Sequence, residues 1–464
     1  MTRMWFGVTV LLAASVGAPA RALASPQRPA AAGDQQWASV YDGPGHGNDK
    51  PASMVISPDG SRVYVTGQSW GGDEAQDDFA TVAYDRTTGA PLWEARYDGP
   101  GTPQLRDDEA VGIAISPDGT KVFVTGSSYQ GQSGTSIVTI AYDAAAGTQG
   151  WLETFSDTGS DVPIDISVSP DGSRVFVTGQ AGLTPGYLTL AYSAASGTHL
   201  WQATYFGVYS LIRATGIATS PDGSSVYVTG FTLSSTLDMT TVSYDAVTGT
   251  EQWETRYDGG QDDVPRALAV TSDGSSVLLA GYTGCCTSQD DMETVSLDAA
   301  TGAELWASMF AGPAGDNDQA IDLAINPGGT RAFVTGWIDQ FQGHSDFGTV
   351  AYDVATGEQQ WVRRYAGDAG GEDVAQAIAA SPDGTAVYVT GASQSQTQVD
   401  FATVAYRSTS GQELWVSRFD GATHGSDRPK DIAITPDGRA VVVTGFSGHE
   451  GQGLDYATVS YRGA

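Results

Sequence analysis

The chain has 464 residues, and its 54 aspartates and glutamates outnumber its 22 lysines and arginines, which gives a formal net charge of −32. A surface this negative repels phosphate backbones and anionic lipid headgroups, so we expect no nucleic-acid partner. Beyond the first two dozen residues no stretch is apolar enough to cross a bilayer, so we expect no membrane insertion.

The N-terminus has the pattern of a secretory signal peptide. Arg3 precedes an apolar run from Val8 to Ala18, and Ala22-Leu23-Ala24 offers small residues for cleavage. No cysteine lies near this point, which argues against a lipid anchor. We therefore expect residues 1–24 to be removed, residues 25–35 to form a flexible segment, and the mature protein to be secreted or periplasmic.

One phrase, SPDGSRVYVTG or a close variant of it, recurs eight times. The copies begin at Ser57, Ser116, Ser169, Ser220, Thr271, Asn326, Ser381 and Thr435, and their spacing is 51 to 59 residues. A β-rich unit repeated at this spacing cannot bury both of its faces alone, so neighbouring units must cover one another. The sequence therefore predicts an all-β, eight-bladed β-propeller that forms a single domain over residues 36–464.

The repeat from Asp373 to Gly421 shows the expected blade. Asp373 to Ser381 suits an innermost strand, and Pro382-Asp383-Gly384 makes a tight turn. The β-branched and aromatic run from Val387 to Gly391 predicts a second strand. Phe401 to Tyr406 and Leu414 to Phe419 follow as third and outer strands. Each blade is thus a four-stranded antiparallel sheet.

The two chain ends carry complementary parts of a blade. The last repeat stops after a third strand, Asp455 to Tyr461, with no outer strand behind it. The stretch from Gln36 to Gly43 reads as an outer strand with no blade before it. We expect Trp37 to Tyr41 to complete the eighth blade, which would close the ring and remove its free sheet edges. We expect a monomer.

The turn between the third and outer strands carries the pattern Ala-x-Asp-x-x-Thr-Gly-x-x-x-Trp, complete at Ala83–Trp93 and at Ala351–Trp361. This pattern resembles the tryptophan-docking repeat of the pyrroloquinoline quinone (PQQ)-type eight-bladed propellers, the quinoprotein alcohol dehydrogenase-like superfamily. The resemblance implies that one tryptophan of each blade packs structurally on the next blade. These residues are Trp37, Trp93, Trp151, Trp201, Trp253, Trp306, Trp361 and Trp415.

Cys285 and Cys286 are the only cysteines, and they are adjacent. In an exported protein they can close as a strained vicinal disulfide. The PQQ alcohol dehydrogenases carry such a pair above the quinone, so the resemblance implies PQQ and calcium for an enzymatic reading. No motif here matches that family's calcium ligands or catalytic aspartate. Two loop thiols or a disulfide without a function are the alternative, and we expect no cofactor.

Aspartates recur on one face of the expected ring, the face that carries the connections between blades and that we term the upper face. They start the first strands or the third strands of the blades: Asp49, Asp108, Asp161, Asp263, Asp318, Asp373 and Asp427, then Asp78, Asp238, Asp291, Asp346, Asp400 and Asp455. One hypothesis is a mouth that collects cations. The alternative, which we favour, is that each carboxylate accepts backbone N–H bonds at a turn.

Three histidines flank the closing blade. His46, His424 and His449, with Asp49 or Asp427, form a candidate site for a divalent transition metal. Their glycine-rich surroundings show no tight ligand spacing. Solvated loops are the alternative.

The innermost strands carry polar side chains that differ between blades, near the upper end of the central channel. They form a candidate ligand site: Asp165, Arg213, Arg266, Asp322, Gln376, Lys430 and Asp431. The alternative is that the charged members pair with one another and keep a narrow channel neutral.

These observations predict a secreted binding or scaffold propeller without catalysis. Its partner would be an extracellular protein or a glycan on the upper face. The alternative function is a PQQ-dependent, calcium-assisted dehydrogenase that uses the vicinal cysteines near an axial quinone.

Overall fold

The computed structural model describes residues 31–72, 76–100, 107–129, 134–157, 159–182, 186–207, 212–284, 289–313, 317–340, 344–367, 369–396, 398–422, 424–449 and 453–464. Residues 32–464 form one compact unit. The expected signal peptide, residues 1–24, lies outside the described residues. None of the described residues belongs to a helix that is long and apolar enough to span a membrane.

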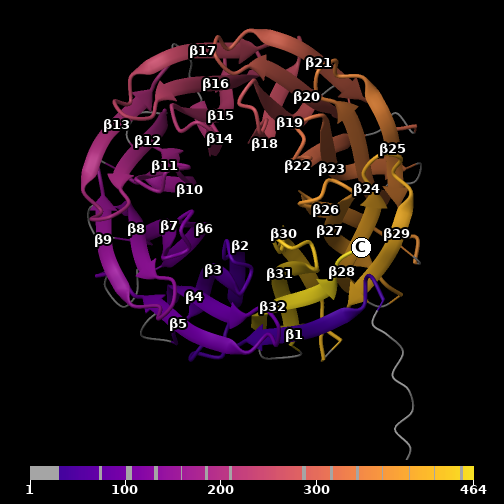
Figure 1. Cartoon of the computed structure of the whole chain (residues 1–464), viewed down its shortest axis with the longest axis horizontal. Helices are drawn as coiled ribbons and strands as arrows, with labels where there is room; N and C mark the ends of the chain where they lie inside the picture. Colours follow the sequence, from indigo (N-terminus) through magenta and orange to yellow (C-terminus); the bar gives the residue numbers. More distant parts are fainter. Residues whose placement is uncertain are drawn as a thin grey trace, which may run out of the picture. The chain divides into compact units, whose positions relative to one another are not determined.

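The unit is a ring of eight four-stranded antiparallel sheets, as predicted (Figure 1). The first four blades are β2–β5, β6–β9, β10–β13 and β14–β17. Their strands are β2 (Asp49–Ile56), β3 (Arg62–Trp70), β4 (Asp77–Asp85), β5 (Pro91–Tyr97), β6 (Asp108–Ile115), β7 (Lys121–Tyr129), β8 (Thr135–Asp143), β9 (Gln149–Phe155), β10 (Val162–Val168), β11 (Arg174–Gln180), β12 (Tyr187–Ser193), β13 (His199–Tyr205), β14 (Ile212–Thr219), β15 (Ser225–Leu233), β16 (Leu237–Asp245) and β17 (Glu251–Tyr257).

Blades five to seven are β18–β21, β22–β25 and β26–β29, and blade eight joins β30–β32 to β1. Their strands are β18 (Asp262–Val270), β19 (Ser276–Gly284), β20 (Asp291–Asp298), β21 (Glu304–Phe310), β22 (Asp318–Ile325), β23 (Arg331–Gln340), β24 (His344–Asp353), β25 (Gln359–Tyr365), β26 (Asp373–Ala380), β27 (Ala386–Gln394), β28 (Val399–Arg407), β29 (Glu413–Phe419), β30 (Asp427–Ile434), β31 (Ala440–His449), β32 (Gly453–Arg462) and β1 (Gln35–Tyr41).

The N-terminal strand closes the ring, which confirms the predicted closure. β1 pairs antiparallel with β32, with Trp37 opposite Ser460 and Val40 opposite Ala457. The backbone N–H of Gly33 also donates to the carbonyl of Arg462 at 2.8 Å. In Figure 1 the indigo strand β1 therefore lies beside the yellow strand β32.

The core lies between the blades. The second and third strands of each blade are covered on both faces, so their sequences are continuous runs of β-branched and aromatic residues such as Val63-Tyr64-Val65. One cluster, for example, packs Phe176 and Tyr187 of blade three against Val226 and Val228 of blade four. Each blade thus buries its face only by contact with its neighbour.

The outer-strand tryptophans form the second contact between blades. Trp93 Nε1 donates to the carbonyl of Ala144 in the next blade at 3.1 Å, and Trp306 Nε1 donates to that of Val354 at 2.8 Å. Each indole also covers the glycine of the next blade's Thr-Gly or equivalent turn. A Cβ added to Gly147 would come within 2.6 Å of Trp93, so only glycine fits there.

Candidate functional site

Every innermost strand carries a β-bulge near its upper end, and this bulge decides where the channel side chains lie. The pairing with the second strand skips one residue in each blade. The skipped residues are Ala52, Val111, Ile164, Thr215, Arg266, Ile321, Gln376 and Lys430. The next residue regains its place in the ladder, and Asp165, Asp322 and Asp431 occupy that position. The seven candidate ligand residues therefore belong to different structural classes.

The three aspartates tie neighbouring blades together. Asp322 accepts the N–H of Leu323 on its own strand at 2.8 Å and the N–H of Ile378 in the next blade, also at 2.8 Å. Asp165 accepts the corresponding N–H groups of Ile166 and Ile217, at 2.7 and 3.2 Å.

Asp431 makes the same connection across the closure. It accepts the N–H of Ile432 at 2.7 Å and, in blade one, the N–H of Met54 at 2.8 Å and the hydroxyl of Ser53 at 3.1 Å. All three carboxylates therefore join inner strands, and both oxygens of each are used.

The pKa values of these carboxyl groups are raised because burial disfavours the charged form. Burial raises the pKa of Asp165 to about 6 and that of Asp322 to about 7, and the charge of Asp431 adds to both shifts. Burial also raises the pKa of Asp431 itself. The backbone donors oppose these shifts because they stabilise the carboxylate.

The other four channel candidates have surroundings different from those of the carboxylates. The Arg266 guanidinium lies 5.4 Å from the centre of the Tyr282 ring, a cation–π distance. Arg213 and Lys430 are exposed, and Gln376 is half-buried. Within the described part of the chain, no ion pair joins the seven candidates to one another.

The aspartates that start the first strands are buried, and they accept hydrogen bonds from the segment that leads into their blade from the preceding one. In each of the seven blades that have one, an oxygen accepts a backbone N–H from that connection, as Asp49 does from Gly43 at 2.7 Å. In four blades the other oxygen accepts the N–H of the residue 21 positions later, at 2.8 to 3.1 Å. These donors are Trp70, Gly182, Asp339 and Gln394.

Four junctions between blades gather a further aspartate, and each then holds three carboxylates whose nearest oxygens lie within 4.8 Å of one another. We call these sets the aspartate triads. The members are Asp42, Asp49 and Asp455; Asp78, Asp98 and Asp108; Asp238, Asp258 and Asp263; and Asp400, Asp420 and Asp427. Two members of each triad are buried and one is exposed.

The exposed member of each triad is not among the aspartates predicted from the repeat pattern. Asp42, Asp98, Asp258 and Asp420 all come from an Asp-Gly dipeptide that directly follows the outer strand. The recurrence of Asp-Gly at this position is the sequence feature by which these four aspartates can be recognised. An outer-strand arginine partly neutralises three triads: Arg96 bonds Asp78 at 2.8 Å, Arg418 lies 3.3 Å from Asp400, and Arg256 pairs with Asp238. At the closing junction Val40 occupies the arginine's position.

The histidines bind carboxylates of their own loops. His46 Nδ1 lies 2.7 Å from Asp42, and His424 Nδ1 lies 2.6 Å from Asp420. Both residues have left-handed φ values, 50° and 54°. The hydrogen bond and the negative charge of the carboxylate raise the pKa of each imidazole. His449 ends β31, and its side chain lies outside the described residues, as do Cys285 and Cys286.

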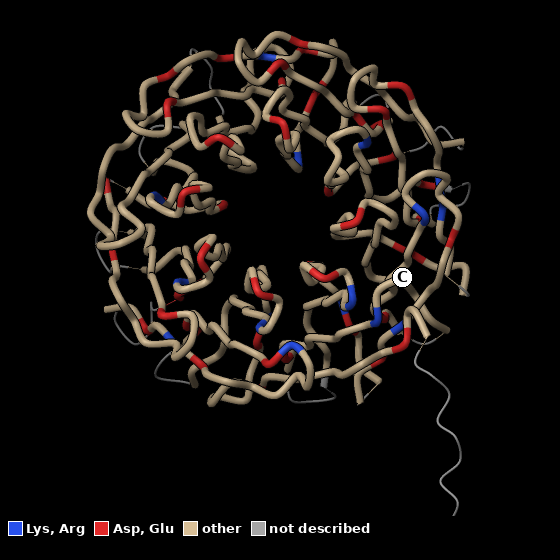
Figure 2. The backbone as a smooth tube through the Cα atoms, viewed as in Figure 1, with Lys and Arg blue, Asp and Glu red and all other residues tan. Residues whose placement is uncertain are grey.

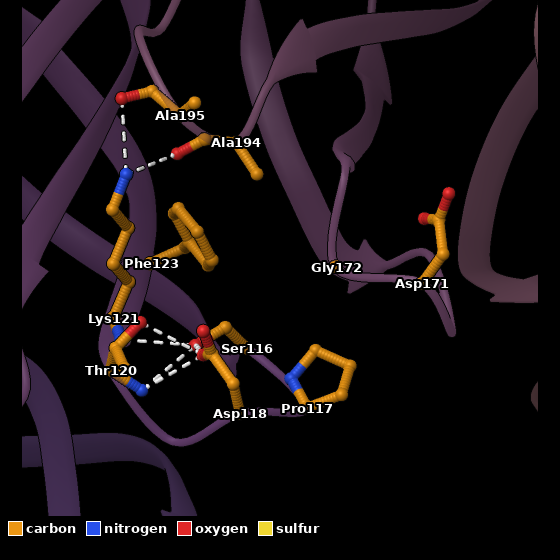
Figure 3. A pocket seen from close by; sticks show the side chains of 10 residues that line it. All are labelled: Ser116, Pro117, Asp118, Thr120, Lys121, Phe123, Asp171, Gly172, Ala194 and Ala195. Atoms are coloured by element: carbon orange, nitrogen blue, oxygen red, sulfur yellow. Dashed lines mark hydrogen bonds between the residues drawn. The ribbon is translucent and has the colours of Figure 1, made fainter.

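Depressions also lie between blades at the turns that join the first and second strands, and hydrogen bonds within the protein use the polar groups of their walls. In the one between blades two and three, Lys121 Nζ donates to the carbonyls of Ala194 and Ala195 at 2.9 and 3.0 Å (Figure 3). Asp118 accepts from Ser116 and from Thr120 in the same view. This depression is part of the contact between repeats.

The family model described as outer membrane protein assembly factor BamB, a PQQ-repeat model, matches residues 134–323 and 266–452, which overlap and together cover more than half of the chain. The chain belongs to this BamB-like PQQ-repeat family. No curated protein matches it.

Solved structures show the same propeller fold. Sqt1 of Chaetomium thermophilum, bound to the N-terminus of ribosomal protein L10, is 13% identical over 92% of this chain and 100% of its own, with a TM-score of 0.59. The quinohemoprotein alcohol dehydrogenase of Comamonas testosteroni is 14% identical over 92% and 76%, with a TM-score of 0.53. BamB of Moraxella catarrhalis is 16% identical over 92% and 98%, with a TM-score of 0.49. The chain thus shares its fold with Sqt1 and with a quinohemoprotein alcohol dehydrogenase, and the fold alone does not choose between their activities.

Proposed function

We propose that this propeller is a non-catalytic binding protein whose upper face docks a partner protein with a lysine- and arginine-rich surface. The observation that carries this proposal is the repetition of aspartate triads at four junctions of one face. The N-terminal signal pattern supports export, so the partner would be met outside the cytoplasm. We further propose that the protein acts as a monomer.

The charge distribution favours a cationic partner over a glycan. Three carboxylates with at most one paired arginine leave each triad negative, and its Asp-Gly aspartate is exposed. Figure 2 shows aspartates and glutamates around the whole ring, with fewer lysines and arginines among them. Such an arrangement steers cationic proteins and gains affinity when opposite charges meet. A neutral glycan would not benefit from it.

The hydrogen bonds of the channel carboxylates favour a structural role over ligand binding. Asp165, Asp322 and Asp431 spend both oxygens on backbone N–H groups. Two such bonds, one to each of two neighbouring inner strands, hold each carboxylate in place and give it a structural role without a ligand. The polar groups at the exposed junctions are the better candidates for partner contacts.

The test compares two charge-matched variants for binding of a decalysine peptide. The first, Asp42→Asn/Asp98→Asn/Asp258→Asn, removes the exposed member of three triads. The second, Glu251→Gln/Glu304→Gln/Glu413→Gln, removes three exposed charges from outer strands. We expect the first variant to bind the peptide at least tenfold more weakly than the second, and both affinities to fall as salt rises.

Equal loss in the two variants would refute the upper-face assignment, because general charge alone would then explain binding. Reconstitution with PQQ and Ca²⁺ tests the enzymatic alternative. Dye-linked alcohol oxidation by the reconstituted protein would overturn the proposal of a non-catalytic propeller.

A further inference from the structure

The junction between blades three and four lacks the carboxylates that the other junctions of the upper face carry. Each aspartate triad takes one residue from the beginning of a third strand, one from an Asp-Gly dipeptide and one from the start of the next first strand. At the junction between blades three and four, the equivalent residues are Gly186, Phe206 and Ile212. The other seven junctions all keep the aspartate that starts the first strand. One sector of an acidic face is therefore uncharged at these positions.

The outer-strand arginine of this junction is replaced together with the carboxylates. Thr204 stands at the position that Arg96 occupies in blade one. Ile212 is fully buried and lies opposite Thr232, whose hydroxyl pairs with that of Thr240 at 2.9 Å. Apolar packing and hydroxyl pairs thus take the place of the charged contacts that are made at the triads.

The ring of Phe206 lies over Gly186 at this junction. A Cβ added to Gly186 would come within 3.3 Å of that ring and within 2.8 Å of the carbonyl of Tyr205, so the glycine leaves the room in which the ring lies. Phe206 is nevertheless 51% exposed. One part of its ring therefore rests on blade three, and the rest is apolar surface whose burial by a partner would be favourable.

Blade three also carries the other apolar side chains that are exposed away from the outer strands. In the described part of the chain ten large apolar residues are exposed, of which six lie on outer strands and one, Val247, lies at a turn after a third strand. The remaining three are Val162 and Ile164, at the upper end of β10, and Phe206. Exposed apolar groups within a polar surface are typical of a protein-binding site.

We infer that Phe206 is the apolar anchor of the partner-binding face. It packs against one aromatic or large aliphatic side chain of the partner, and lysines and arginines of the partner lie on either side of that side chain. This inference rests on the proposed function, because it names the contact that the acidic face makes with the uncharged part of a basic partner. Protein interfaces commonly place such an aromatic residue among polar and charged contacts.

Charge complementarity selects this kind of partner. A lysine placed at the junction between blades three and four would meet none of the three carboxylates, so an apolar residue fits better there. The aspartate triads between blades one and two and between blades four and five lie on either side of this sector. They attract cations, and the partner that fits is therefore a basic segment that one apolar side chain interrupts.

The test uses two synthetic peptides, a decalysine interrupted at its centre by one tryptophan and the same decalysine interrupted by one serine. We call them the tryptophan peptide and the serine peptide. Their affinities are measured for the unmodified protein, for Phe206→Ser and for the control Leu305→Gln. Leu305 is also 51% exposed, but it lies on the outer strand β21. Phe206→Ser and Leu305→Gln introduce residues that other blades carry at these positions, namely Ser156 and Gln360, so the fold should tolerate both.

We expect the unmodified protein and Leu305→Gln to bind the tryptophan peptide about fivefold more tightly than the serine peptide, because an aromatic pair adds to the binding free energy. Phe206→Ser should bind the two peptides equally. Its affinity for the serine peptide should match that of the unmodified protein, since neither substitution changes the net charge.

Three results would overturn the inference: equal affinities of the unmodified protein for the two peptides, an unchanged preference in Phe206→Ser, or loss of the preference in Leu305→Gln as well. Sedimentation of the protein alone tests a second copy of the chain as the occupant. A dimer that Phe206→Ser dissociates would replace the basic partner by that copy. The serine peptide reports on the charges and the ratio of the two affinities reports on Phe206, so failure of the proposed function and failure of this inference are distinguishable.

Discussion

The indole of Trp415 lies on Gly33, at the opposite end of the chain. A Cβ added to Gly33 would come within 2.8 Å of that ring, and the hydroxyl of Ser417 donates to the Gly33 carbonyl. The same contact recurs around the ring, as between Trp93 and Gly147. Gly33 therefore supplies to the eighth blade the turn glycine that each of the other blades carries internally.

Replacing Gly33 by alanine should destabilise the ring through this contact. Gly33 has φ +82°, and Gly260 has φ +91° with no atom within 4 Å of an added Cβ. Both Gly33→Ala and Gly260→Ala incur the cost of a left-handed alanine, about 1 kcal/mol. Only Gly33→Ala also meets the indole, at a further cost of about 1 to 3 kcal/mol. Urea denaturation should show this difference, and equal losses would contradict the packing role.

Deleting Gln36 to Gly43 should open the eighth blade. β32 would lose its partner and become an exposed edge strand, which promotes association between molecules. We expect a broader urea transition and light scattering from aggregates. If the truncated chain stayed monomeric and unfolded cooperatively, the ring would not need β1 for its stability.

A circular permutant tests the same closure in the opposite direction. Joining Ala464 directly to Ala32 gives Tyr-Arg-Gly-Ala-Ala-Gly, the same length as the turn from Tyr84 to Gly89. A chain that runs from Pro44 to Ala464 and continues with residues 32–43 should therefore fold cooperatively as a monomer. If the permutant failed to fold, the ring would require its chain ends at the turn between β32 and β1.

Asp322→Ala should cost about 2 to 3 kcal/mol of unfolding free energy. The substitution leaves the N–H groups of Leu323 and Ile378 without their acceptor where little water reaches them. Gln376→Ala is the control, because Gln376 is the skipped residue of the neighbouring bulge. Urea melts of both variants measure the difference, and a loss no larger than that of the control would argue against the tie between blades.

Glu293→Gln should remove a pH dependence of stability. Burial raises the pKa of Glu293 to about 7, the charges of Asp263, Glu304 and Asp291 add to this shift, and the Tyr257 hydroxyl opposes it. A raised folded-state pKa gives stability that is present below about pH 4 and is lost as pH rises through 7. The unmodified protein should therefore lose about 2 to 3 kcal/mol relative to Glu293→Gln between pH 5 and pH 8. Parallel stability curves would contradict this.

The repeated phrase was enough to predict the fold, because its turn residues and its continuous runs of β-branched and aromatic residues depend on local geometry that the sequence shows directly. The closure followed from the half-blades at the two ends. Gly33 was overlooked because its partner, Trp415, is adjacent only once the ring is closed. The aspartate triads were harder to predict from the sequence for a related reason. Each triad takes one residue from each of three separate segments, as Asp400, Asp420 and Asp427 do.

The channel residues illustrate a second limit. Arg266 and Asp322 both appear as polar exceptions on inner strands, yet a bulge puts the first outside the ladder and the second inside it. A shift of one residue in a strand reverses the side to which a side chain points. The periodicity of the sequence does not locate the bulge, so the bonds of Asp322 to Ile378 could not be foreseen.

The pairing of β1 with β32 joins the two described strands that lie farthest apart in the sequence. The other seven sheets are built from strands that follow one another along the chain, so each can form without a contact across the whole ring. Loop closure costs the most entropy for the eighth sheet, because its two partners are separated by all the others. We therefore expect refolding to end with this pairing, and the adhesive edges of β1 and β32 to stay uncovered until that step.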